Sequence, residues 1–330
     1  MIDRVEYGVP KQAADLLIEP SQGWLTATDS WRPLGIVDLS ACPESLRLQA
    51  LPPFPVIGLG DPAHPLAGAL DAIVEPPIYV DALIRQATRA PHAAAIAVQL
   101  LRSLDGLPFE RALQLESMCY GLLQGSAEHA AWLASRAPLR HGADSGRVAA
   151  KLIVERHDSV LHLVLNRPEA RNAIDRDLRD QLFEACTLAT LDPDISAIKL
   201  RAVGPAFSIG GDLQEFGTTR DPATAHLIRS RTLPALALAR CAEILDVHVQ
   251  GACVGAGVEM TAFARRVTAT PDAWFQLPEL AMGLIPGAGG CVSVPRRIGR
   301  QRAGLLILSG RRISAATALH WGLIDAIEAP

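Results

Sequence analysis

The chain has 330 residues, a formal net charge of −4, 49% hydrophobic residues and 20% charged residues. This composition excludes a disordered chain, and the length predicts one large domain or two modest ones. The acidic balance argues against broad binding to nucleic acid or to an anionic membrane surface. Since no apolar run has the length of a membrane span and no signal-peptide pattern follows the N-terminus, we expect a cytoplasmic protein.

Residues 1–79 contain short strand candidates separated by turns rich in Pro and Gly, and no catalytic constellation. The strands are predicted at Gly35–Leu39, Pro55–Leu59 and Ala72–Val74. This part is therefore interpreted as an N-terminal strand and turn region of unknown role.

Residues 80–136 are predicted to be helical, with helices over Val80–Thr88, Ala93–Leu104 and 108–124. In the third helix, four apolar residues recur at 3-4-3 spacing and define its expected buried face: Ala112, Leu115, Cys119 and Leu122. Gly125 is expected to end this helix.

Residues 137–150 form a polar, turn-rich stretch that we interpret as a linker. Beyond it, in residues 151–330, strands alternate with helices, which favours a layered α/β architecture. The expected strands are Ala150–Arg156 paired with Val160–Asn166, then Ile195–Ala202 and Ile244–Gln250; a helix over 175–190 has Asp175 as N-cap, and Ala206–Leu213 is a turn.

The six cysteines are scattered, without a Cys-x-x-Cys pair and without a cluster of histidines. They are Cys42, Cys119, Cys186, Cys241, Cys253 and Cys291. This pattern predicts reduced, mostly buried thiols, and neither a disulfide framework nor a metal site.

Two glutamates lie 279 − 259 = 20 residues apart, each beside a glycine-rich turn. Glu259 follows Gly251–Gly257, which starts a helix, and Glu279 precedes the turn Pro286–Gly290. Glycine-rich backbone can direct N–H groups at a developing negative charge. Two carboxyl groups beside such N–H groups can handle one proton as acid and base, which suits chemistry at a carbonyl. The alternative for each glutamate alone is a charge at a helix start or on the surface.

Four segments in order resemble the crotonase superfamily, also called the enoyl-CoA hydratase/isomerase family. They are Leu165–Ala173, Ala206–Asp212, Val249–Glu259 and Gln276–Gly290. The resemblance covers residues 151–330 and implies an α/β fold, a spiral of ββα units, with an additional mixed N-terminal region. It also implies a homo-oligomer, a trimer or a hexamer.

The order of the remaining segments differs from that of the family. Gly322–Asp325 matches the segment that precedes a C-terminal helical region in relatives, yet the sequence stops at Pro330. Residues 80–136 instead resemble that region, which forms a lid and a trimer contact in the family. We therefore expect a rearranged crotonase in which these helices pack at the substrate end of the core.

The resemblance implies a role for each site residue. Glu259 and Glu279 would be the catalytic carboxyls, and the backbone N–H groups of Ile209 and Ala256 would bind the thioester oxygen as an enolate forms. Residues implied at the CoA ester are Glu169, Ala170, Arg171, Gly210, Gly211 and Asp212. Asp212 could orient the loop or form only an Asx turn. Arg167, Arg171, Arg296 and Arg297 are candidates for CoA phosphates or surface arginines, His248 is interpreted as a core histidine, and Pro286–Gly290 as a structural turn.

The presence of both glutamates favours hydration of a 2-enoyl-CoA, because isomerases of the family commonly keep only the second. The resemblance implies an acyl-CoA substrate, no metal and no cofactor beyond the CoA of the substrate. Two alternatives remain open. One is another enolate reaction, such as isomerisation or CoA-ester hydrolysis, and the other is a non-catalytic acyl-CoA-binding homologue.

Overall fold

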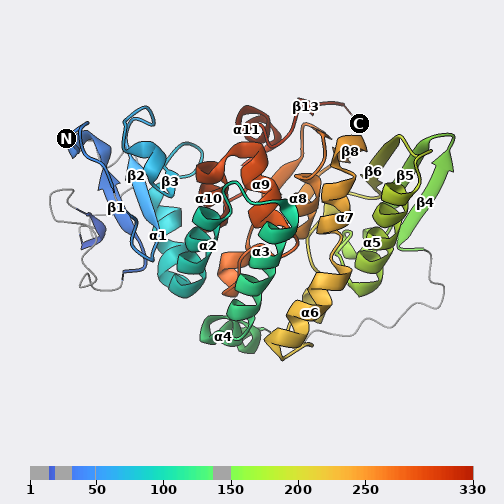
Figure 1. Cartoon of the computed structure of the whole chain (residues 1–330), viewed down its shortest axis with the longest axis horizontal. Helices are drawn as coiled ribbons and strands as arrows, with labels where there is room; N and C mark the ends of the chain where they lie inside the picture. Colours follow the sequence, from blue (N-terminus) through green and yellow to red (C-terminus); the bar gives the residue numbers. More distant parts are fainter. Residues whose placement is uncertain (1–14, 19–31, 49, 137–149, 330) are drawn as a thin grey trace.

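The computed structural model describes residues 15–18, 32–48, 50–136 and 150–329. Three regions follow one another along the long axis: a small sheet, a layer of helices and a larger core of strands and helices (Figure 1). The predicted linker, residues 137–150, lies outside the described residues except for Ala150.

The small sheet consists of parallel strands in the order β1-β2-β3, which confirms the three predicted strands. Their bounds are β1 (Gly35–Asp38), β2 (Val56–Leu59) and β3 (Ala72–Ile73). Buried Asp71, just before β3, accepts a 2.7 Å hydrogen bond from Nε of Arg102 in the helical layer. The sheet is thereby joined to the rest of the molecule by a buried ion pair.

The helical layer comprises α1 (Val80–Arg89), α2 (Pro91–Ser103), α3 (Phe109–Gln124) and α4 (Ala127–Ser135), so the three predicted helices are confirmed. The predicted apolar face of α3 was wrong at Leu122, which is 63% exposed, whereas Leu123 is buried. The face that packs against the core is rotated by one position and includes the carboxyl of Glu116.

The core contains two sheets, and successive strands from β6 to β11 alternate between them. The six-stranded sheet has the order β13-β10-β8-β6-β5-β4 and the four-stranded sheet the order β12-β11-β9-β7. The first sheet contains β4 (Leu152–His157), β5 (Val160–Leu165), β6 (Ala197–Ala202), β8 (Leu245–Val249), β10 (Arg266–Ala269) and β13 (Ala326–Ile327). The second contains β7 (Ala206–Ser208), β9 (Ala252–Val254), β11 (Trp274–Gln276) and β12 (Ile313–Ser314). This alternation is the expected spiral of ββα units.

The core helices are α5 (Arg176–Leu191), α6 (Pro222–Thr232), α7 (Ala235–Arg240), α8 (Ala256–Thr261), α9 (Gly290–Ile298), α10 (Arg300–Ser309) and α11 (Ala315–Trp321). Asp175 caps α5 as predicted, since its carboxylate accepts a 2.9 Å bond from the N–H of Leu178. The segment Ala206–Leu213, expected to be a turn, begins with strand β7. Phe207 is fully buried there, and β7 pairs with β9.

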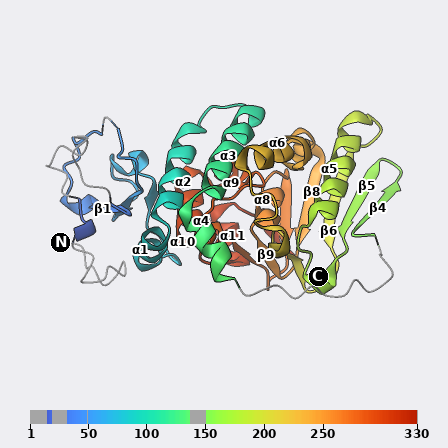
Figure 2. The same ribbon diagram turned by 90° about the horizontal axis from the view of Figure 1, so that it is seen from below.

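The helical layer packs on the core beside α6, α7, α9 and α10, at the end where the glycine-rich turns lie (Figure 2). Nδ1 of His129 in α4 lies 2.9 Å from the carbonyl oxygen of Met282, just after Glu279. The Glu128 carboxylate accepts bonds from the N–H groups of His92 and Ala93 at the start of α2. The layer is therefore fixed both internally and to the segment that carries Glu279.

Candidate active site

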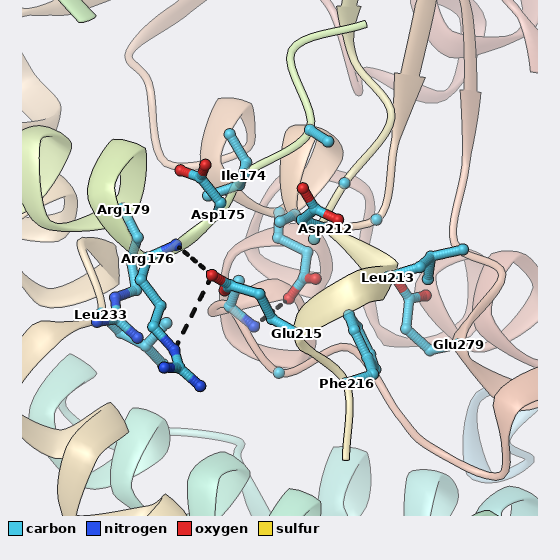
Figure 3. Close-up of a pocket in the computed structure, with 18 of the residues that line it drawn as sticks. Ile174, Asp175, Arg176, Arg179, Asp212, Leu213, Glu215, Phe216, Leu233 and Glu279 are labelled. Carbon is cyan, nitrogen blue, oxygen red and sulfur yellow. Dashed lines mark hydrogen bonds and ion pairs between the residues drawn. The ribbon is translucent and has the colours of Figure 1, made fainter. Parts of the chain in front are cut away.

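One cavity of about 700 Å³ lies between the core and helices α3 and α6. It is lined by the two predicted glutamates, by both glycine-rich loops and by side chains of the helical layer; Figure 3 shows Glu279 on one side and Arg176, Arg179 and Leu233 on the other. The cavity is therefore the place where most of the predicted site residues meet.

Glu259 lies on α8 and is 2% exposed. Its Oε2 accepts hydrogen bonds from the N–H groups of Ala288 (2.6 Å) and Gly290 (2.8 Å). A Cβ at Gly290 would lie 2.5 Å from Cγ of Glu259, so glycine is required for this approach. Burial raises the pKa of Glu259 to about 7, although the two backbone hydrogen bonds oppose the shift. The carboxyl is therefore partly ionised near neutral pH.

Glu279 begins the short 3-10 helix Glu279–Met282 and differs from Glu259 in its hydrogen bonding. Its Oε2 is buried and has no hydrogen-bond partner among the described residues. A Cβ at Gly255, which has φ +50°, would lie 2.7 Å from Oε1 of Glu279, so this carboxyl lies directly against the glycine loop. Burial and then the neighbouring Glu259 raise the pKa of Glu279 well above its usual range. It is a buried carboxyl with one unoccupied oxygen beside the cavity.

A third carboxyl, Glu116 of α3, was missed by the sequence reasoning. It is 1% exposed, and it accepts hydrogen bonds from the N–H groups of Gly289 (2.7 Å) and Cys291 (2.8 Å). Burial and then the charge of Glu259 raise its pKa well above the usual range. Glu116 follows Ala112 by four residues, so the helical period placed it on the buried face.

The turn from Pro286 to Cys291 thus directs four successive N–H groups alternately at Glu259 and at Glu116. The sequence reasoning treated Pro286–Gly290 as a structural turn rather than a phosphate loop. In the structure it binds carboxyl groups of the protein itself, one from the core and one from the helical layer.

The first glycine-rich loop requires a correction at Ile209. Its N–H donates to the carbonyl oxygen of Arg171 at 3.2 Å, so it is not directed at the cavity. Gly211 forms a parallel bridge with Ile174, in which the N–H of Ile174 donates to Gly210 and the N–H of Asp212 donates to Ile174. In this geometry the N–H of Gly211 points away from Ile174.

The second loop places the N–H of Ala256 beside this first loop. A Cβ at Gly210 would lie 3.5 Å from the nitrogen of Ala256, so the two loops are in close contact. Within the described part of the chain, the N–H groups of Gly211 and Ala256 have no hydrogen-bond partner, and both residues line the cavity. They are two backbone donors that the geometry leaves available, one on each loop.

The other predicted residues divide into two groups. Ala170, Gly210, Gly211 and Asp212 line the cavity, together with the side chain of Ile209, whereas Glu169 and Arg171 are exposed residues outside its lining. Asp212 forms the Asx-type cap, since its Oδ1 accepts from the N–H of Gln214 at 3.0 Å, and its Oδ2 lies 2.9 Å from Nη2 of Arg167.

Among the candidate arginines, only Arg167 lines the cavity. Arg297 donates to the carbonyl oxygens of Ala264 and Leu323, and Arg296 stacks over the ring of Phe109 at 3.6 Å. His248, expected to be a core histidine, is half-buried, with Nδ1 2.8 Å from Oγ1 of Thr268.

All six cysteines are free, and five of them are buried, as predicted. In the described ranges, no group of three or more His, Cys, Asp or Glu side chains is arranged to hold a metal ion. A search of the same residues finds no helix with the length and apolarity of a membrane span.

Comparisons with known proteins agree with the arrangement of the core. A family model described as "Enoyl-CoA hydratase/isomerase" matches residues 155–330 and not the helical layer. The 2,3-dehydroadipyl-CoA hydratase of Escherichia coli (strain K12) is 35% identical over 178 residues, which cover 54% of this chain and 69% of that protein. The enoyl-CoA isomerase/hydratase fer4 of Mycosarcoma maydis is 35% identical over 188 residues, which cover 51% of this chain and 65% of that protein. An enoyl-CoA hydratase structure from Mycobacterium smegmatis has a TM-score of 0.51 at 30% identity, covering 55% of this chain and 71% of that one.

Proposed function

Because the chain belongs to the enoyl-CoA hydratase/isomerase family, we propose that it adds water to a 2-enoyl-CoA thioester in the cavity of about 700 Å³. The observation that carries the proposal is the contrast between two buried carboxyls beside one cavity. Glu259 is hydrogen-bonded and has a pKa of about 7, and Glu279 has an unoccupied oxygen and a pKa well above its usual range. One carboxylate and one carboxylic acid are the pair that hydration requires.

The thioester oxygen binds to the N–H groups of Gly211 and Ala256 in this proposal. As water adds to Cβ, negative charge moves to that oxygen, and both donors stabilise the resulting enolate. Removing one such donor typically costs about 10²–10³ in rate. Backbone donors held by the bridge at Ile174 and by the contact between the two loops need little rearrangement during the reaction.

In this proposal, the protonation state of each carboxyl decides which proton transfer it performs. Ionised Glu259 accepts a proton from the water while the water oxygen forms a bond to Cβ. Protonated Glu279 donates its proton to Cα, which removes the enolate charge and gives a 3-hydroxyacyl-CoA. The two carboxyls return to their starting states by exchanging one proton, so no metal or redox cofactor is required, and hydration is expected to survive treatment with EDTA.

Two alternatives are separated from hydration by the fate of the substrate. Isomerisation moves a double bond by a proton transfer at one carboxyl, and hydrolysis releases free CoA. A non-catalytic homologue would bind acyl-CoA without turnover. The isomerase/hydratase name of the relative from Mycosarcoma maydis keeps the first of these alternatives relevant.

The testing experiment follows loss of the conjugated-thioester absorbance with crotonyl-CoA and longer 2-enoyl-CoAs. Glu259→Gln and Glu279→Gln should each lower kcat by about 10²–10⁴ with unchanged circular dichroism. Turnover that survives in either variant would contradict the assigned role of that residue. If the wild type binds acyl-CoA without turnover, the protein is a non-catalytic homologue and the proposed hydration is wrong.

We also propose a cytoplasmic homo-oligomer, a trimer or a hexamer, with the helical layer as the region that supplies its contacts. Light scattering of the purified chain tests the assembly, and cell fractionation tests the location. A monomer at micromolar concentration would overturn the proposed assembly.

A further inference from the structure

Arg229 of α6 lines the same cavity, at the wall formed by α6 and α3, which lie side by side (Figure 2). Its guanidinium donates three hydrogen bonds, from Nε to Oγ of Ser117, from Nη2 to the carbonyl oxygen of Ser117 and from Nη1 to Oε1 of Gln124. It also lies over the ring of Tyr120, 4.7 Å from the ring centre. The group is thus held in one orientation by α3.

All these partners are neutral. In the described part of the chain, no carboxylate lies within 4.0 Å of the guanidinium, in contrast to the ion-paired Arg167 of the same cavity. Three of the five N–H groups of an arginine are used, which leaves two. Burial lowers the pKa of Arg229, the sign of a cation that has lost part of its hydration without direct compensation.

None of the nearby carboxyls supplies the missing negative charge by direct contact with the guanidinium of Arg229. Burial and then the charge of Glu259 raise the pKa values of Glu116 and Glu279 well above the usual range, and both oxygens of Glu116 accept from the N–H groups of Gly289 and Cys291. Glu259 is partly ionised, but its Oε2 is bound by backbone N–H groups of the turn. Among the described residues, a partly dehydrated cation therefore lines the cavity without a carboxylate in contact with it.

The position of Arg229 relative to the reacting carbons follows from Tyr120. A Cβ at Gly287 would lie 2.2 Å from the Tyr120 ring, so this ring touches the turn whose next N–H, that of Ala288, binds Glu259. Tyr120 therefore connects the catalytic carboxyl with Arg229. Apolar residues of α6 and its C-terminal end complete this wall of the cavity: Ala225, Ile228, Leu233 and Pro234.

We propose that the acyl chain of the substrate ends in a carboxylate that binds the guanidinium of Arg229. This inference rests on the proposed function, since it takes Cα and Cβ to lie at Glu279 and Glu259. The chain then continues past Cβ, away from the sulfur, along the apolar wall and Tyr120. At its end a carboxylate supplies the two acceptor oxygens and the negative charge that Arg229 lacks.

The test compares pairs of CoA thioesters of equal chain length, one ending in a methyl group and the other in a carboxylate. Saturated pairs are measured by calorimetry, which requires no turnover, and 2-enoyl pairs by loss of conjugated-thioester absorbance. The wild type should prefer the carboxylate-ended ester by about 10- to 100-fold in Kd and in kcat/KM at the best chain length. Arg229→Gln should remove this preference, and Arg229→Lys should retain part of it.

Arg231→Gln is the matched control, because it removes an exposed arginine of the same helix. It should leave the preference unchanged. Equal or tighter binding of the methyl-ended ester by the wild type would overturn the inference, as would an unchanged preference in Arg229→Gln. If neither 2-enoyl ester is hydrated, the proposed hydratase function fails, while calorimetry with the saturated pair still decides the role of Arg229.

Discussion

The ββα core and the helical layer contribute to one cavity in different ways. The core supplies the N–H groups of Gly211 and Ala256 and the carboxyls of Glu259 and Glu279, all within or beside glycine-rich turns. The layer supplies Glu116, which never reaches solvent and is bound by the turn after Glu279. In the proposed reaction the core therefore carries the reacting groups, and the layer fixes the turn that orients Glu259.

The two regions share one set of hydrogen-bond donors. The N–H groups of Ala288 and Gly290 donate to Glu259, and those of Gly289 and Cys291 donate to Glu116. A displacement of α3 would therefore move the turn and, with it, the carboxyl of Glu259. Substitutions in each region therefore test the positioning role of the layer separately from the proposed chemistry of the core.

The largest expected effect comes from the layer. Glu116→Ala leaves the N–H groups of Gly289 and Cys291 buried without acceptors, at about 1–3 kcal/mol each, so unfolding should become easier by ~2–6 kcal/mol. Urea unfolding measures the loss. Glu110→Ala, an exposed carboxyl of the same helix, should change stability by less than about 1 kcal/mol. Equal effects of the two variants would contradict the buried position of Glu116.

The packing of the layer is tested by two adjacent leucines. Leu123→Ala removes a buried side chain and should cost about 2–5 kcal/mol in the free energy of unfolding. Leu122→Ala, one residue earlier and 63% exposed, should cost less than about 0.5 kcal/mol in the monomer. A larger loss of stability in Leu122→Ala than in Leu123→Ala would instead support the apolar face expected from the 3-4-3 pattern.

A change in the core should affect activity. Gly255→Ala adds a Cβ at φ +50°, 2.7 Å from Oε1 of Glu279, and should lower kcat/KM by about 100-fold, equal to ~2.7 kcal/mol. Gly106→Ala is the control, because Gly106 also has a positive φ but has open space around it. If both variants lose the same activity, backbone strain rather than contact with Glu279 is responsible.

The smallest effect is that of pH. With Glu259 as base and its pKa at about 7, kcat/KM should rise about tenfold from pH 6 to pH 8. Since the folded-state pKa is raised, the folded state holds this proton at pH values where the unfolded chain has released it. Stability from this group is therefore complete below about pH 4.5 and falls as the pH rises to about 7. A flat activity profile, or an unfolding free energy in Glu259→Gln with an unchanged pH slope, would contradict this assignment.

The sequence predicted the core better than the layer's role. Strand pairing around Asp158 and the cap at Asp175 depend on neighbouring residues, so local patterns were sufficient. Glu116 was missed because its burial depends on N–H groups 173 and 175 positions away. The resemblance implied Ile209 by its place in the loop, whereas the direction of each N–H is decided by the bridge to Ile174.

The position of Glu116 also has a consequence for synthesis of the chain. Its hydrogen-bond donor Gly289 lies 173 residues later in the chain. At roughly 5–20 residues per second, about 10–35 s separate the emergence of the two from the ribosome. Throughout that interval, α3 carries a carboxyl on its apolar side that has no native partner. The native contacts of the Glu116 carboxyl can therefore form only after Gly289 and Cys291 have been translated.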